Sequence, residues 1–219
     1  SGQAAAPHTG AAPFTCVWDT RTCQGLATLR GAHALGIAAV AFDAGGGNQL
    51  ATAGLEPSHA VALWDWERGV LLARVSTGAA RIFGLSVRPS PTAADPRAVE
   101  IAACGVRSLC FLIGGVVGGA VAAAGGGPAA AGGGVAAAAA TEGATEVLLL
   151  RCRRGAWRGA AAPCTLLCVA HAHSTSASGG SGECIAGSAR GELLLWQDYA
   201  LLRVVHAHAG PVMSLAVPP

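Results

Sequence analysis

Short apolar runs separated by turn residues dominate the pattern along this chain. Outside one Gly/Ala-rich segment, runs of five to seven residues rich in Val, Ile, Leu and Thr alternate with Gly, Pro, Ser and Asp, as in all-β proteins. No stretch outside that segment keeps a helical period, so we expect almost no helix. The predicted strands are 14–18, 25–30, 37–42, 49–54, 60–66, 70–75, 82–87, 99–105, 108–113, 146–151, 165–171, 183–188, 192–198, 201–206 and 211–217.

A repeat orders these strands. Trp18-Asp19 is followed by Trp64-Asp65 after 46 residues, and Phe111-Leu112 comes 47 residues later in the same context. Trp196-Gln197 falls close to one further period along the chain if residues 114–146 are an insertion and are left out of the count. A similar period with Trp-Asp at the end of one strand is typical of the four-stranded blades of a WD-repeat β-propeller. We therefore predict an all-β fold, a partial WD-repeat β-propeller of three to four blades.

Two side-chain types are expected to hold these blades together. Each blade is apolar on both faces and must stack on a neighbour, so Trp18, Trp64 and Trp196 are predicted to fill the space between sheets. His33 and His208 each precede the innermost strand of a blade and are predicted to support it.

The same pattern divides the chain into four parts. Residues 1–13 are predicted to be a flexible tail, 14–113 blades, 114–146 a disordered Ala/Gly-rich insertion, and 147–219 blades that continue beyond the chain end. The only Met is Met213, which suggests a piece of a longer protein. The uncharged stretch 108–141 is long enough to cross a bilayer, but its Gly triplets and Pro128 argue against a spanning helix, and we expect no membrane association.

Composition narrows the class of function. The formal net charge is +2, with 14 Arg and no Lys, which argues against a dedicated nucleic-acid binder. Eight Cys without the dense spacing of a small secreted scaffold indicate reduced thiols in a cytosolic setting. Four of them, Cys104, Cys110, Cys168 and Cys184, lie in apolar runs and are expected to be buried.

Candidate chemical sites are few. The pairs His171/His173 and His206/His208 each place two imidazoles on one strand face, which zinc could use together with Cys164 and Cys168. The chain has no Cys-x-x-Cys, and structural or solvated histidines are the alternative. It also lacks the Gly-x-Ser-x-Gly turn of a serine nucleophile and a phosphate-binding Lys-Ser/Thr ending. We predict no enzymatic activity and no cofactor.

One local charge feature stands out beside Trp157. Arg151, Arg153, Arg154 and Arg158 lie within eight residues. They could bind the acidic tails of tubulin through charge-assisted contacts, or RNA through phosphate pairing and stacking. The remaining possibility is a solvated rim whose charges prevent strand-to-strand aggregation.

Several segments together resemble a particular family. The run HALGIAAVAFDAGGGNQLATAGLEPSHAVALWDWERGVLLARV (33–75) and the run GSARGELLLWQDYALLRVVHAHAGPVMSL (187–215) resemble the WD repeats of echinoderm microtubule-associated protein-like (EMAP-like) proteins. AACGVRSLCFL (102–112) and RRGAWRG (153–159) are similar to further segments of that family. The resemblance covers roughly 14–113 and 146–217.

This resemblance implies a setting and a function. It implies a non-catalytic scaffold from a large microtubule-associated protein of the cytoplasm and cytoskeleton, located in a cilium at the axoneme or basal body. Its partners would be tubulin, other ciliary proteins and the remainder of its own propeller. A WD-repeat adaptor outside the cytoskeleton, such as a substrate receptor or trafficking scaffold, is the alternative.

Two departures from the family pattern concern the blade supports. Glu56 stands where the turn usually carries Asp, and the turn 187–191 carries no acid before Glu192. We therefore expect the hydrogen-bonded His, Asp and Trp support to be incomplete, so that the blades rely more on packing.

Overall fold

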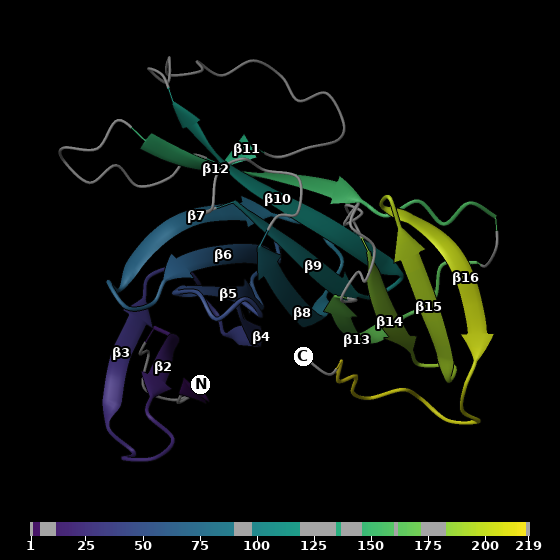
Figure 1. The fold of residues 1–219 in the computed structure, drawn as a ribbon, viewed down its shortest axis with the longest axis horizontal. Helices are drawn as coiled ribbons and strands as arrows, with labels where there is room; N and C mark the ends of the chain where they lie inside the picture. The colour runs from purple at the N-terminus through teal and green to yellow at the C-terminus, as the bar shows by residue number, and fades with distance from the viewer. Residues whose placement is uncertain are drawn as a thin grey trace.

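The computed structural model describes residues 2–4, 12–89, 98–118, 135–136, 146–159, 162–171 and 183–217. Within these residues the chain is all-β and contains no helix (Figure 1). The strands are β1 (Gly2–Ala4), β2 (Phe14–Trp18), β3 (Gly25–Arg30), β4 (Ile37–Phe42), β5 (Gln49–Gly54), β6 (Ala60–Asp65), β7 (Val70–Ser76), β8 (Ile82–Pro89), β9 (Val99–Gly105), β10 (Ser108–Gly118), β11 (Val135–Ala136), β12 (Glu146–Arg154), β13 (Leu166–His171), β14 (Cys184–Ser188), β15 (Glu192–Gln197) and β16 (Ala200–His206).

These strands form four antiparallel sheets. Three are meanders of four consecutive long strands, which we call blade 1 (β4–β7), blade 2 (β8, β9, β10 and β12, extended by the short β11) and blade 3 (β13–β16). A smaller sheet, the partial blade, has the order β1-β2-β3. Figure 1 shows the blades side by side around an arc, with β4, β8 and β13 on its inner side and β7 and β16 on its outer side. The all-β partial propeller predicted from the repeat is confirmed.

Each junction between neighbouring sheets holds its own apolar cluster. The partial blade meets blade 1 through Val17, Leu29, Leu50 and Trp64. Blade 1 meets blade 2 through side chains such as Val61, Val75, Ile101, Leu112 and Leu150. Blade 2 meets blade 3 through side chains such as Leu109, Phe111, Leu166, Leu194 and Trp196. The strands β5, β6 and β9 are buried along their whole length because both faces of their sheets are covered.

One predicted strand is not formed. Residues 211–217 are described but lie outside any strand. The Val212 amide donates to the Ser188 carbonyl at 3.0 Å, and the Val212 carbonyl accepts from Cys168 Sγ at 3.3 Å. These contacts dock the segment on blade 3 without the ladder of backbone hydrogen bonds that a strand requires.

The predicted insertion and tail differ in part from the structure. Strand β10 continues to Gly118 and pairs with β12 as far as Glu146, so residues 114–118 extend blade 2. The short strand β11 also falls within 114–146, and β1 within the predicted tail pairs with β2. Residues 119–134 and 137–145 of the insertion, and 1 and 5–11 of the tail, lie outside the described residues. Over the described ranges, no helix is long and apolar enough to cross a membrane.

Candidate functional site

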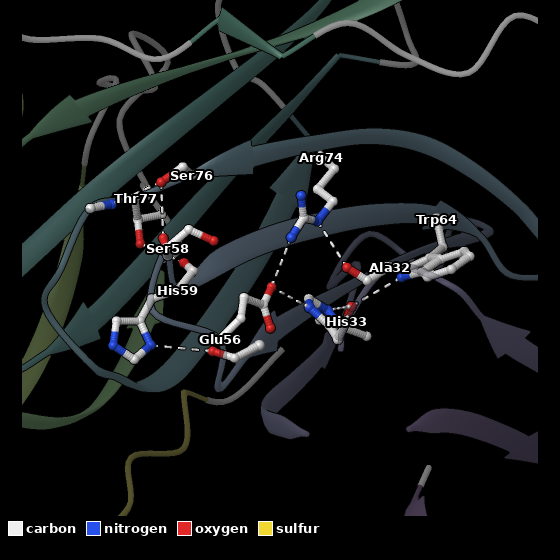
Figure 2. Close-up of polar contacts among 12 residues, drawn as sticks. Ala32, His33, Glu56, Ser58, His59, Trp64, Arg74, Ser76 and Thr77 are labelled. Atoms are coloured by element: carbon white, nitrogen blue, oxygen red, sulfur yellow. Dashed lines mark hydrogen bonds and ion pairs between the residues drawn. The ribbon is translucent and has the colours of Figure 1, made fainter. Parts of the chain in front are cut away.

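A buried series of polar contacts joins blade 1 to the loop that precedes it (Figure 2). Trp64 Nε1 donates to the hydroxyl of Thr52 at 3.0 Å, and that hydroxyl lies 2.8 Å from His33 Nε2. His33 Nδ1 lies 3.0 Å from Glu56 Oε1. An ionised carboxylate only accepts, so Nδ1 donates to Glu56, while Nε2 shares a hydrogen bond with the Thr52 hydroxyl. The network therefore fixes three segments of the blade with directional bonds.

Arg74 extends this network to the outer strand β7. Its Nη2 donates to Glu56 Oε1 at 3.0 Å and its Nε donates to the carbonyl of Ala32 at 2.8 Å (Figure 2). Burial by itself raises the pKa of Glu56, but the hydrogen bond from His33, that from its own backbone amide, the charge of His33 and the hydrogen bond from Arg74 outweigh it. The pKa of Glu56 lies below its ordinary value of 4.5, and the carboxylate stays ionised at neutral pH.

The expectation of an incomplete support is wrong for blade 1. Glu56 occupies the place expected for Asp, and its carboxylate reaches both His33 and Arg74. The network thus joins a carboxylate to an imidazole, that imidazole to a hydroxyl, and that hydroxyl to an indole.

Blade 3 lacks the equivalent network. Ala186 occupies the position of Thr52, and among the described residues the buried Trp196 Nε1 has no hydrogen-bond partner. His208, which follows blade 3 and precedes residues 211–217, is exposed, and its backbone amide donates to the Gly191 carbonyl at 3.0 Å. Trp196 is instead held by rings, with Trp157 and Phe111 in edge contacts at centroid distances of 5.2 and 6.4 Å. Ring packing therefore holds Trp196, where blade 1 holds Trp64 with a hydrogen bond.

The partial blade departs from the predicted packing at Trp18. This side chain is 41% exposed, so the prediction that it packs between sheets is wrong. Trp64 and Trp196 are 3% and 2% exposed. The difference arises because each of these two is covered by a neighbouring sheet, whereas Trp18 is at the end of β2 and outside the apolar cluster that joins the partial blade to blade 1.

The Asp of each Trp-Asp pair stabilises a turn. Asp19 Oδ1 accepts from the amides of Arg21 and Thr22 at 2.7 and 3.0 Å, and these backbone hydrogen bonds lower the pKa of Asp19. Asp65 accepts from the Asn48 side chain at 2.7 Å and from the Arg68 amide at 3.0 Å. Both carboxylates therefore fix the chain just after a strand.

The predicted arginine cluster is divided by the strand that carries most of it. Arg151, Arg153, Arg154 and Arg158 are all exposed. The Arg153 guanidinium lies 4.4 Å from the Tyr199 ring centroid and so faces blade 3. Arg154 instead approaches Gly78, in the loop after blade 1. Arg158 follows in a turn with a φ of 43°. The four arginines do not form one surface, because neighbouring side chains in a strand point to opposite faces.

The structure describes three of the four histidines in the predicted pairs, His171, His206 and His208. His171 is buried, its Nδ1 lies 2.9 Å from the Ser86 hydroxyl, and burial, together with the charge of Arg88, lowers the pKa of His171 to about 3. His206 is exposed and lies 4.0 Å from Glu192. His173 lies outside the described residues. No group of three metal-ligating side chains is found in the part of the chain that the structure describes.

All eight cysteines are unpaired. Cys104, Cys110 and Cys184 are buried as predicted, whereas Cys168 is partly exposed. Burial, together with the charge of Cys168, raises the pKa of Cys104 to about 12, and burial also raises that of Cys184. A hydrogen bond from the Cys152 thiol lowers the pKa of Cys110 to about 6 against the opposing effect of burial. The Cys110 side chain is 4% exposed and lies in the core between blades 1 and 2.

Two members of the buried network were not anticipated from the sequence. Thr52 is a polar residue within a run that is otherwise apolar, and Arg74 is a charge within the strand VLLARV. A polar residue inside an apolar run is a signal for a buried hydrogen bond, because burial without a partner is costly. The sequence of such a run does not show which residue the polar side chain bonds, or whether it donates or accepts.

Comparisons with known proteins address the fold. No family model matches the chain. The chain is similar to the Cps50 (Swd1) β-propeller domain of Myceliophteria thermophila, with a TM-score of 0.53, 18% identity, and coverage of 93% of this chain and 52% of that chain. Sqt1 of Chaetomium thermophilum, bound to the N-terminus of the ribosomal protein L10, gives a TM-score of 0.45 at 13% identity over 94% of this chain and 60% of that one. Sqt1 of Saccharomyces cerevisiae gives 0.42 at 12% identity over 94% and 59%.

The chain therefore spans about half the length of the propeller domain that it matches. Together with the three meanders and their apolar junctions, this likeness shows that the fold of the chain is that of a partial β-propeller.

Proposed function

We propose that this chain is part of a non-catalytic β-propeller scaffold that binds other proteins. The observation that supports the proposal most is the buried network of blade 1. His33, Thr52, Glu56 and Arg74 are the residues there that could do chemistry, and each is used to hold the blade. A stack fixed in this way presents its loops in constant positions, which suits recognition.

The remaining reactive groups also fit a structural role. The Cys110 thiol is buried between blades, where a substrate cannot reach it. The Ser86 hydroxyl accepts a hydrogen bond from the His171 backbone amide at 3.1 Å. The same hydroxyl is hydrogen-bonded to the His171 imidazole. This hydroxyl therefore links blade 2 to blade 3 and is not poised as a nucleophile.

The setting that we propose is the microtubule cytoskeleton, within a cilium at the axoneme or basal body. It is supported by the resemblance of 33–75 and 187–215 to the EMAP-like family. The partners would then be tubulin or other ciliary proteins, together with the remainder of the propeller.

Co-sedimentation with microtubules over a series of salt concentrations tests this setting. We expect the chain in the pellet at low salt and its progressive release as salt rises, because contacts between exposed charges are screened. Recovery in the supernatant at every salt concentration would overturn the microtubule setting and favour an adaptor outside the cytoskeleton. A parallel experiment uses microtubules from which the acidic tails have been removed. It distinguishes binding to the tails from binding to the rest of the microtubule surface.

A further inference from the structure

Acidic side chains are unevenly distributed between the two ends of the blades. In an antiparallel meander, the turns after the second strands (β5, β9 and β14) lie at the same end as the loops after the fourth (β7, β12 and β16). Two of the described acids lie at this end, Glu56 and Glu192, and both are held in contacts within their own blades. The other end carries Asp19, Asp43, Asp65, Glu67, Glu183 and Asp198, in turns or at their margins.

Three exposed arginines lie at the first end, on three segments that contact one another. The Val106 amide donates to the Arg81 carbonyl at 2.9 Å, which holds the β9–β10 turn, with Arg107, against the loop that carries Arg81. Arg154 ends β12, and its Nη2 is 3.2 Å from where a Cβ on Gly78 of that loop would lie. We call Arg81, Arg107 and Arg154 the basic end.

These three guanidiniums are available to a partner. Each side chain is exposed, and none makes an ion pair with a carboxylate among the residues that the structure describes. The Arg81 guanidinium lies 5.5 Å from the Phe83 ring centroid, which restricts its position without neutralising its charge. Two further arginines are already used, since Arg74 binds Glu56 and Arg88 binds Glu100.

The side chains at the basic end favour an acidic polypeptide over nucleic acid as the partner. Guanidiniums bind carboxylates in a bidentate manner, and an end without free acids attracts negative charge. Nucleic acid without base pairing is usually bound by arginines interleaved with exposed aromatic rings. The exposed aromatic residues, Trp18 and Phe42, lie at the opposite end, whereas the exposed apolar residue between Arg81 and Arg107 is Val106, at 40%.

We propose that the basic end binds an acidic polypeptide segment, with Asp or Glu side chains on Arg81, Arg107 and Arg154 and an aliphatic contact at Val106. The proposal rests on the scaffold function above and names the chemistry of its partner. It also replaces the linear cluster 151–158 with a surface formed by three segments, of which Arg154 alone belongs to that cluster.

Fluorescence anisotropy with a labelled poly-glutamate peptide tests this proposal. The triple variant Arg81→Gln, Arg107→Gln, Arg154→Gln should bind the peptide about tenfold or more weakly than the unmodified chain, with a shallower salt dependence. A matched variant, Arg21→Gln, Arg68→Gln, Arg203→Gln, removes the same charge from exposed arginines elsewhere and should bind as the unmodified chain does. Circular dichroism should show the same thermal unfolding for the test variant and the unmodified chain, because all three side chains are on the surface.

Three results would overturn the proposal: equal loss of affinity in both triple variants, no binding of poly-glutamate by the unmodified chain, or tighter binding of a labelled single-stranded oligonucleotide than of the peptide. Failure to sediment with microtubules, combined with poly-glutamate binding that depends on the basic end, would reject the microtubule setting alone. Equal sedimentation with intact and tail-stripped microtubules would instead place the tubulin contact outside the basic end.

Discussion

At the residue scale, Glu56 shows how one carboxylate can serve two segments of a blade. Its Oε1 atom receives both His33 and Arg74 at 3.0 Å, so it joins the loop before β4 to the outer strand β7. The sequence places Glu56 in the correct turn. That its side chain reaches His33 depends on how the loop 31–36 folds back over β5, which no local pattern specifies.

The charge of Glu56 makes blade 1 sensitive to acid. Its pKa is lowered on folding, so the unfolded chain takes up the proton first and the stabilisation is lost as pH falls from its ordinary value of 4.5 through the folded value. Glu56→Gln should lower the free energy of unfolding by about 2 kcal/mol at pH 7, because an uncharged amide replaces a carboxylate that accepts charge-assisted bonds.

Urea denaturation at pH 7 and below pH 4 measures this effect. The gap between the unmodified chain and Glu56→Gln should shrink at the lower pH. The exposed Glu67→Gln is the control and should leave stability unchanged at both pH values. A gap that is the same at both pH values would argue against an ionised Glu56 in the network.

The two buried tryptophans should respond differently to loss of the indole N–H. Trp64→Phe removes a hydrogen bond to Thr52, whereas Trp196→Phe removes an N–H that has no partner. Both changes remove similar ring volume. We expect Trp64→Phe to cost about 1 kcal/mol more than Trp196→Phe in urea denaturation. Equal costs, or a larger cost at Trp196, would contradict the assigned network.

At the scale of the elements, alternation of apolar and turn residues predicts the strands well. The ranges 14–18, 25–30, 37–42, 49–54 and 99–105 agree with β2, β3, β4, β5 and β9 at both ends. The failures have a common cause. Residues 211–217 have a strand-like sequence but pair with none of the strands that the structure describes, and β10 extends through glycines because β12 offers it a ladder. Pairing is a property of two segments, which single-segment patterns do not contain.

Gly105 connects the element scale to the basic end. A Cβ at this position would overlap the Arg81 carbonyl oxygen, so only glycine allows the β9–β10 turn to contact the preceding loop. Gly105→Ala should destabilise the chain by about 2 kcal/mol through this clash, as measured by thermal or urea unfolding.

Gly25→Ala supplies the comparison, since a Cβ there would meet no atom within 4 Å. It should leave the unfolding transition near that of the unmodified chain. If the two substitutions have the same effect, the close contact between the turn and the loop is not a feature of the fold in solution.

At the scale of the whole molecule, the charged residues at the two ends of the blades have different roles. Asp19, Asp43 and Asp65 bind backbone amides and so shape the turns at one end. Arg81, Arg107 and Arg154 have no such role at the other end. The sequence predicted an arginine-rich surface around 151–158, but the convergence of Arg154 with Arg81 and Arg107 depends on contacts between three loops and appears only in the folded chain.

Hydrogen exchange with and without a poly-glutamate peptide tests the central claim, that a rigid blade stack recognises acidic polypeptide at its basic end. The account predicts slower amide exchange, in the presence of peptide, over 77–82, 105–110 and 152–156 together, with no change at 43–48 and 65–69 of the opposite end. Slower exchange at the opposite end, or none over the three segments of the basic end, would contradict it.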